Sequence, residues 1–349
     1  MLNSVGMTQR DLARRTGRPL KTINQIVMGK TAITSETALQ FERVLGVSAA
    51  FWVSREAHYR TYLELDQESR RLEVSVDWAR RFPIKEMTKH EWLPAANTAV
   101  QKLQGLLNFF GIASPQEFDR VCLPSASFRM PAKLAADKYS LSAWLRKGEI
   151  EAQAIECEPF DAERFRQALQ EARALTVKPP QVFLIELRRL CSAAGVAVVL
   201  VRELPKMRAS GATRWLSPQK SLIQLCLRGR YADIFWFSFF HEAAHILRHG
   251  KREAFLDDLC AGIVKDDGQK SQKEIEADEF ASNHLIPRLQ LQDFKQSQKR
   301  SANAVRAFAG DLRISPGIVV GRLQHEGYIP HSHLNNLRVR MTWTDPGCE

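Results

Sequence analysis

One stretch of the chain, residues 233–250, limits the possible folds more than any other. It reads DIFWFSFFHEAAHILRHG and contains His241, Glu242 and His245 in the spacing H-E-x-x-H. Residues four apart lie one above the other on an α-helix, so both imidazoles would point the same way. Large apolar residues surround them on nearly all sides, which is typical of a buried helix. We therefore expect the chain to fold around this helix.

Two histidines and a glutamate on a buried helix need partners, because burying polar groups without them is costly. A metal ion is the simplest explanation, since two ring nitrogens on one face can hold one Zn²⁺. Glu242 lies about a third of a turn from His241. From there its carboxylate can reach a water at the metal without taking a metal position, as the base of a zinc hydrolase does. The alternative is a pair of core histidines bonded to backbone carbonyls.

A catalytic zinc site takes three protein ligands and keeps one position open. His249 is excluded as the third ligand, because eight residues of helical rise put it roughly 12 Å from His241. It is expected at the surface or behind a ligand. A better candidate lies in KEIEADEFASNHLIP, residues 273–287, where Glu274 and Asp278 share one helical face with small and apolar residues. We assign Glu274 to the metal and Asp278 to a hydrogen bond with a ligand imidazole.

The N-terminal segment predicts three short helices. The first begins near Thr8 and ends at Gly17, the second covers residues 19–28, and the third covers residues 35–45. The second helix should turn Ile23, Ile26 and Val27 inward. Its outer face is rich in polar side chains, namely Lys21, Thr22, Asn24 and Gln25, with Lys30 just beyond. Such a face can read bases in the major groove, so the pattern fits a helix-turn-helix, although any small helical bundle could show similar faces.

This region resembles the Xre/Cro-type helix-turn-helix domain, especially its HigA-like antitoxin branch. TQRDLARRTG, KTINQIVMGKTAIT and ETALQFERVLGVSAAFW carry the resemblance. It implies that Leu20, Lys21 and Gln25 face bases. It also implies that Gln9 and Lys30 lie near phosphates.

The chain departs from that family in two ways. Pro19 takes the position of the usual Ser or Thr cap before the recognition helix. Six residues precede Met7, where the family has a full first helix. The expectation is therefore either that the true start lies further upstream or that the first helix is truncated and DNA binding is weakened.

The segment after Pro180 predicts a change from helices to strands. Residues 182–194 predict a helix and VAVVLVREL a buried strand, and ASGATRW and SLIQLCLRG follow as two more strands. A small antiparallel sheet would then lead into the H-E-x-x-H helix. Its exposed edge could pair with an extended peptide substrate.

Residues 180–290 resemble the ImmA/IrrE family of zinc metallopeptidases. The resemblance rests on DIFWFSFFHEAAHILRH and EIEADEFASNHLIP. It implies that His241, His245 and Glu274 are zinc ligands and that Glu242 is the catalytic base. Members of the family cleave repressor proteins, and many are fused to a helix-turn-helix. His284 stands where the family usually has leucine, and we leave it out of the site because it lies off the Glu274 face.

The expected fold class is α+β and mostly helical. The expected order is a helix-turn-helix domain over residues 1–54, a helical connector over 55–179, a minimal zincin domain over 180–290, a helical extension over 291–335 and a tail over 336–349. The helical extension is expected to pack against the zincin domain, and the chain beyond Leu334 is expected to be frayed.

Charge and cysteine content limit the partners and the compartment. A formal charge of +11 favours a polyanionic partner, although an excess of Lys and Arg is also a common solvated surface. The six cysteines include no C-x-x-C pair, which is typical of reduced thiols. Neither a secretory signal nor an apolar run long enough to cross a bilayer is found, so we expect a cytoplasmic protein without a membrane partner.

The sequence leads to the hypothesis of a cytoplasmic, DNA-binding zinc metallo-endopeptidase. Its expected partners are a double-stranded DNA operator and a protein substrate, such as a repressor or a toxin-antitoxin partner. A homodimer is expected by analogy with other helix-turn-helix regulators. The alternative is an antitoxin-like transcriptional regulator whose zincin domain senses or binds a partner without turnover.

Overall fold

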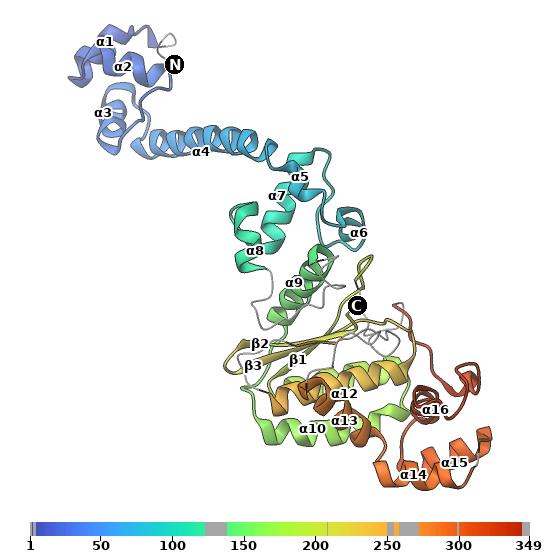
Figure 1. Cartoon of the computed structure of the whole chain (residues 1–349). Coiled ribbons are helices and arrows are strands. Elements are labelled where there is room, and N and C mark those ends of the chain that lie inside the picture. The colour runs from blue at the N-terminus through green and yellow to red at the C-terminus, as the bar shows by residue number, and fades with distance from the viewer. Residues whose placement is uncertain are drawn as a thin grey trace. The chain divides into compact units, whose positions relative to one another are not determined.

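The computed structural model of the chain describes residues 2, 5–122, 138–207, 209–249, 255–257, 272–298 and 300–343 (Figure 1). The chain packs as two units, Met1–Val76 and Asp77–Glu349. The predicted end of the helix-turn-helix domain, residue 54, lies inside helix α4, which runs from Ala49 to Glu73. The other domain boundaries stay predictions.

The first unit begins with the three predicted helices, α1 (Gln9–Thr16), α2 (Leu20–Val27) and α3 (Ser35–Leu45). The residues predicted to cap these helices are found at the helix ends. The amide of Asp11 donates to Thr8 Oγ1 at 3.1 Å, and Gly17 and Gly46 end α1 and α3 with φ of 70° and 73°. The expected helical boundaries are therefore confirmed to within a residue or two.

A small core holds these helices together, built around Leu12, Ala13, Ile23 and Phe41. Ile26 also packs against this core. The prediction for Val27 is wrong, because 54% of this residue is exposed. Val27 is the last residue of α2, and the core contacts of that helix are made by Ile23 and Ile26 instead.

The second unit begins with short helices, α5 (Val76–Ala79), α6 (Ile84–Lys89), α7 (Ala99–Phe110), η2 (Pro115–Glu117) and α8 (Phe118–Val121). Aromatic side chains pack them together. Phe82 lies within 5.3 Å of the ring centroids of Phe110 and Phe118 and 4.7 Å from that of Trp78.

A four-stranded sheet follows, made of β1 (Val196–Leu200), β2 (Gly211–Ser217), β3 (Lys220–Leu225) and β4 (Phe255–Asp257) in the order β1-β3-β2-β4. The α+β, mostly helical fold class is confirmed, but the expectation of a purely antiparallel sheet is wrong. β2 pairs antiparallel with β3 and with β4, whereas β1 pairs parallel with β3. The β2–β3 hairpin docks beside β1 through its second strand, which runs in the same direction as β1.

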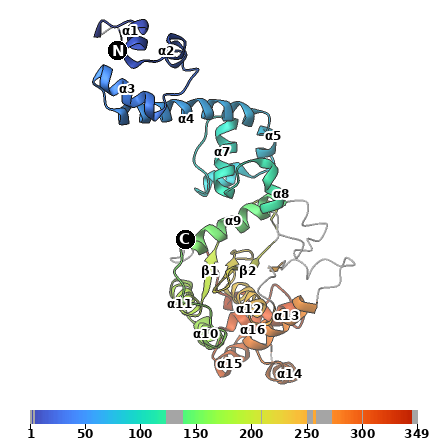
Figure 2. The same cartoon turned by 90° about the vertical axis from the view of Figure 1, so that its left-hand side faces the viewer.

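Helices cover both faces of the sheet (Figures 1 and 2). On one face, α9 (Lys138–Ala154) is anchored by Trp144, whose Nε1 donates to the carbonyl of Val201 at 3.1 Å. On the other face lie α10 (Ala162–Ala174), α11 (Pro180–Ser192) and α12 (Ala232–Arg248). The predicted connector, residues 55–179, contains α9, α10 and the short η4 (Leu175–Val177). Of these, α9 packs on the sheet and Phe165 of α10 lies in the same core as α12.

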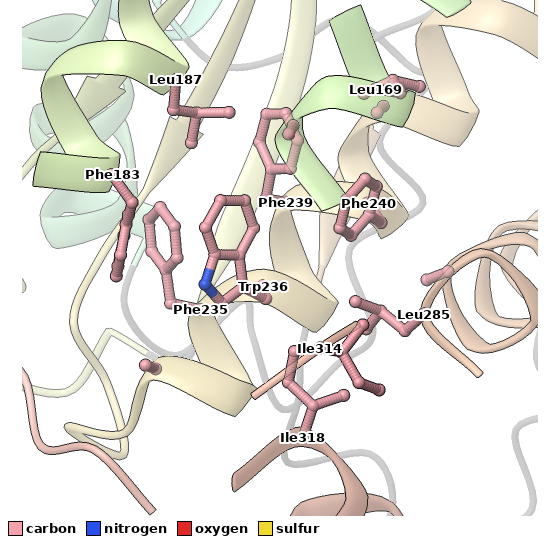
Figure 3. Packing of buried hydrophobic residues seen from close by; sticks show 14 of the residues in the cluster. Leu169, Phe183, Leu187, Phe235, Trp236, Phe239, Phe240, Leu285, Ile314 and Ile318 are labelled. Atoms are coloured by element: carbon pink, nitrogen blue, oxygen red, sulfur yellow. The ribbon is translucent and has the colours of Figure 1, made fainter. Parts of the chain in front are cut away.

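Large aromatic and aliphatic side chains between the sheet and the helices form the main core (Figure 3). The ring centroids of Phe183 and Trp236 lie 4.8 Å apart, with the rings tilted by 49°, and Phe239 and Phe240 of α12 are fully buried. This explains the apolar surroundings of the two histidines in the sequence. The side of α12 that does not carry them is the centre of the core.

Four more helices complete the unit, α13 (Gln272–Leu285), α14 (Arg288–Gln296), α15 (Ala302–Leu312) and α16 (Pro316–His325), followed by η6 (Asn335–Leu337). The expected packing of the extension against the zincin domain is confirmed, because Ile314 and Ile318 lie in the main core. The guanidinium of Arg173 reinforces this region by donating to the carbonyls of His284 at 2.7 Å and of Leu312 at 3.0 Å.

The expectation that the chain frays beyond Leu334 is wrong for residues 335–343. Arg338 forms a bidentate ion pair with the buried Asp233 at the start of α12. Its Nε and Nη2 donate to Oδ1 at 3.0 Å and to Oδ2 at 2.7 Å. The amide of Ala232 donates to the carbonyl of Val339, and Met341 is only 1% exposed. These contacts hold the segment against α12.

Within the described part of the chain, none of the helices combines the length and the apolar character that a membrane crossing needs.

Candidate metal centre

Helices α12 and α13 pack against each other (Figure 1), and the predicted metal ligands belong to these two helices. His241 and His245 of α12 are each 1% exposed. On α13, Ala277 and Ala281 are fully buried, and their small side chains let the two helices approach closely. Glu274 and Asp278 lie on the same side of α13 as these alanines. The close approach therefore brings two carboxylates to the two imidazoles.

The structure brings three side chains together as predicted. His241 Nε2 lies 3.1 Å from Glu274 Oε2 and 3.1 Å from His245 Nε2, and His245 Nε2 lies 3.5 Å from Glu274 Oε1. Ligands about 2.1 Å from a tetrahedral metal are about 3.4 Å apart. The donor set of two imidazole nitrogens and a carboxylate, at these separations, fits Zn²⁺. An ion between Nε2 of His241 and Nε2 of His245 would also explain why these two atoms face each other.

Asp278 lies behind the first of these ligands. Its Oδ1 is 3.0 Å from His241 Nδ1, the ring nitrogen on the side away from Glu274. A carboxylate at this position accepts a hydrogen bond from the Nδ1–H group of His241. The proton is then held on Nδ1, and the lone pair of Nε2 faces the metal position. The arrangement is the one expected for the assigned role of Asp278.

His249 lies behind the second ligand rather than at the surface. Its side chain is 4% exposed, its Nδ1 is 2.9 Å from His245 Nδ1, and its Nε2 is 3.4 Å from Glu276 Oε2. The sequence predicts His249 either at the surface or behind a ligand, and the structure shows the second arrangement. Its side chain does not belong to the three-residue cluster.

Burial controls the charge of the ligands. Burial, together with the nearby His241 and His249, lowers the pKa of His245 to about 2. The imidazole is therefore neutral at any physiological pH, and the neutral ring is the form that binds a metal.

Glu242 is fully buried and points toward strand β2. Thr213 Oγ1 donates to Glu242 Oε2 at 2.5 Å. Two residues earlier on the same face of the strand, a Cβ on Gly211 would come within 2.5 Å of Glu242 Oε1. The hydroxyl of Thr213 thus holds one oxygen of the Glu242 carboxylate, and the absence of a side chain at Gly211 leaves room for the other. Neither Gly211 nor Thr213 was predicted from the sequence as a contact of Glu242. The alternation of Gly211 and Thr213 in a predicted strand was the available signal, but it does not say which helix that face meets.

His284 does not join the cluster, as expected. Its Nε2 is 3.1 Å from the carbonyl of Leu169, and its ring lies 4.5 Å from that of Phe240. Burial lowers the pKa of His284. It therefore serves as a core residue on the side of α13 away from the predicted ligands.

The predicted DNA-contacting residues are accessible on the first unit. Leu20, Lys21 and Lys30 are exposed, and the remaining ones are half-buried, namely Gln9, Thr22, Asn24 and Gln25. Pro19 precedes α2 without a side-chain hydrogen bond to the helix, as its chemistry requires. Whether these residues contact DNA stays a prediction.

Comparison with known protein families agrees with both resemblances. Residues 1–52 match the family described as Helix-turn-helix, and residues 233–324 match the IrrE N-terminal-like domain. No curated protein matches the chain. The second match spans α12 to α16 and contains the whole His-His-Glu cluster. The chain thus combines a helix-turn-helix DNA-binding domain with a metallopeptidase-like domain.

Replacing Asp278 tests the geometry behind the first ligand. We expect Asp278→Ala to weaken Zn²⁺ affinity about 10- to 100-fold, because His241 loses the group that orients its ring. Competition with a chromophoric zinc chelator measures this. Glu279→Ala is the matched control, since Glu279 is the next residue and is exposed. Equal affinities of the two variants would contradict the assignment.

Proposed function

We propose that this protein is a DNA-binding zinc metallo-endopeptidase that cleaves a repressor or another partner protein. The observation that supports the proposal most is the convergence of His241, His245 and Glu274 within hydrogen-bond distances, next to the buried Glu242. A structural histidine pair would not need a carboxylate from a second helix, a further carboxylate behind the first ring and an acid held by a separate strand.

His241, His245 and Glu274 would hold the Zn²⁺ ion, with Asp278 orienting His241. When bound, zinc supplies the Lewis acidity that activates a water and polarises a peptide carbonyl. Glu242 would take a proton from the water as its oxygen adds to the peptide carbonyl carbon. It would then pass that proton to the amide nitrogen, so that the carbon–nitrogen bond breaks and the amine leaves. The hydrogen bond from Thr213 would keep one carboxylate oxygen turned away from this proton transfer and leave the other for it.

The N-terminal domain would bind a double-stranded DNA operator through α2. Residues 1–60 hold nine Lys and Arg against four Asp and Glu, a local charge of +5 that would attract phosphates. Leu20, Lys21 and Gln25 would meet base edges, and Lys30 a phosphate. A homodimer would match a two-fold symmetric operator. Such a protein would act in the cytoplasm, where DNA lies and thiols stay reduced. A repressor or a toxin-antitoxin partner encoded nearby would be its substrate.

Glu242→Gln separates catalysis from metal binding. We expect the variant to keep stoichiometric zinc but to lose cleavage at least 100-fold, because the amide cannot accept the water proton. The measurement is co-expression with each candidate repressor, followed by mass spectrometry of the product. Zinc retained and cleavage unchanged would rule out the assigned base. Cleavage of no candidate by the wild type would favour the alternative, a regulator whose zincin domain binds a partner without turnover.

The two proposed kinds of DNA contact make different predictions. Gln25→Ala should reduce the preference for a selected operator over random DNA about tenfold, because a base contact is lost. Lys30→Ala should weaken binding to both DNAs alike and make it less dependent on salt. Fluorescence anisotropy at several salt concentrations distinguishes them. Unchanged sequence preference of Gln25→Ala would contradict the assigned face.

A further inference from the structure

Helix α4 of the first unit exposes large apolar side chains. It is 25 residues long and runs from Ala49 to Glu73 (Figure 1). The exposed fractions are 68% for Tyr62, 53% for Leu65, 50% for Phe51 and 41% for Tyr59. Single exposed apolar residues are common on soluble proteins, whereas a group of them on one surface marks an interaction site. The positions of these four residues around the helix therefore decide their meaning.

The four residues lie on one side of α4. At about 100° per residue, the other three fall within about 60° of Tyr62. Val53, which is 41% exposed, lies on the opposite side and is not part of the group. Steps of four and three residues alternate along this side, through Phe51, Arg55, His58, Tyr62, Leu65 and Ser69. Such a row is the repeat with which one helix packs along another in a coiled coil. We call these six residues the α4 seam.

The first unit uses a different side of α4 for its own core. Trp52 packs against the core of α1, α2 and α3, and its ring centroid lies 5.4 Å from that of Phe41. In the seam, every residue except Ser69 is exposed. The contacts that hold α4 to its own domain therefore leave the seam open to a partner.

The charges along the seam differ between the two halves of the helix. Arg55 and His58 belong to its N-terminal half, whereas Asp66 and Glu68 lie beside its C-terminal half. Among the described residues, Arg55 forms no ion pair. Asp66 pairs with Arg70 of the same helix at 2.8 Å, but both side chains are at least half exposed, and such a pair contributes little. A helix that offers acidic groups to Arg55 and basic groups to Asp66 would complement this side of α4.

A second copy of α4 that runs in the opposite direction meets this requirement. In the register that pairs Arg55 with Leu65 of the second copy, Arg55 also lies beside Asp66 of that copy, and His58 faces Tyr62. The two-fold symmetry repeats each contact, so both basic halves meet acidic halves. A parallel pair would instead place Arg55 against Arg55, where like charges repel. The sequence of α4 therefore favours the antiparallel arrangement.

We propose that the α4 seam is a dimer interface, in which the α4 helices of two chains pack antiparallel. The inference rests on the proposed function for the homodimer and specifies the surface that forms it. It does not depend on the zinc site. The interface buries the apolar side chains that one chain alone exposes, and its two-fold axis matches the symmetry of the proposed operator.

Acidic substitutions in the seam test the interface in the full chain. Tyr62→Glu and Leu65→Glu should each weaken the dimer at least about tenfold, because each buries an unpaired carboxylate in both copies. Ala57→Glu is the matched control, since Ala57 is exposed on the side of α4 away from the seam, and it should leave the dimer unchanged. Sedimentation velocity over a range of concentrations measures the dissociation constants. Circular dichroism shows that the variants are folded.

A charge exchange tests the direction of the two helices. Arg55→Glu should weaken the dimer about tenfold, because the symmetric contacts with Asp66 change from opposite to like charges. Adding Asp66→Arg to Arg55→Glu should restore the affinity, since residues 55 and 66 meet only in the antiparallel pair. A double variant that dimerises no better than Arg55→Glu alone would overturn the antiparallel pairing.

Two further results would overturn the inference in distinguishable ways. A wild-type chain that is monomeric at every concentration would eliminate the interface and the proposed homodimer, but would leave the proposed zinc peptidase standing. A dimer that Tyr62→Glu and Leu65→Glu weaken no more than Ala57→Glu does would eliminate the α4 interface and leave the homodimer to another surface.

Discussion

The close packing of α13 against α12 is the contact on which the rest of the second unit depends. Fully buried alanines, Ala277 and Ala281, allow it, and it brings the carboxylate of Glu274 to 3.1 Å from His241. Without that approach, two buried imidazoles would face each other with no anionic partner. The aromatic core behind α12 fixes one side of the contact, and Arg173 fixes the other by donating to carbonyls at the end of α13. The candidate metal centre is thus part of the packing and not an addition to a finished fold.

Local patterns predicted the helices and the proximity of His241, His245 and Glu274. Thr8 and Gly17 mark the ends of α1 because caps act within a few residues, and the H-E-x-x-H spacing projects two imidazoles from one face whatever surrounds the helix. Glu274 could be found because a carboxylate among small residues is unusual on a buried helical face. These inferences needed only the periodicity of one helix at a time.

Features that depend on contacts between distant segments could not be predicted in the same way. A buried strand and a hairpin do not reveal which strand of the hairpin pairs with the first, so the parallel β1–β3 pair was missed. Thr213 holds Glu242 across 29 positions of sequence, and Arg338 holds Asp233 across 105. Each of these needs the fold before its residues can be recognised.

The central claim is that one zinc ion is held between α12 and α13 by three side chains. The most direct measurement is inductively coupled plasma mass spectrometry of the purified full chain and of His241→Ala, with Glu279→Ala as the control. Glu279 lies on α13 but is exposed and outside the cluster. The account predicts about one zinc per chain for the wild type and the control, and close to none for His241→Ala. Zinc absent from the wild type, or retained by His241→Ala, would contradict it.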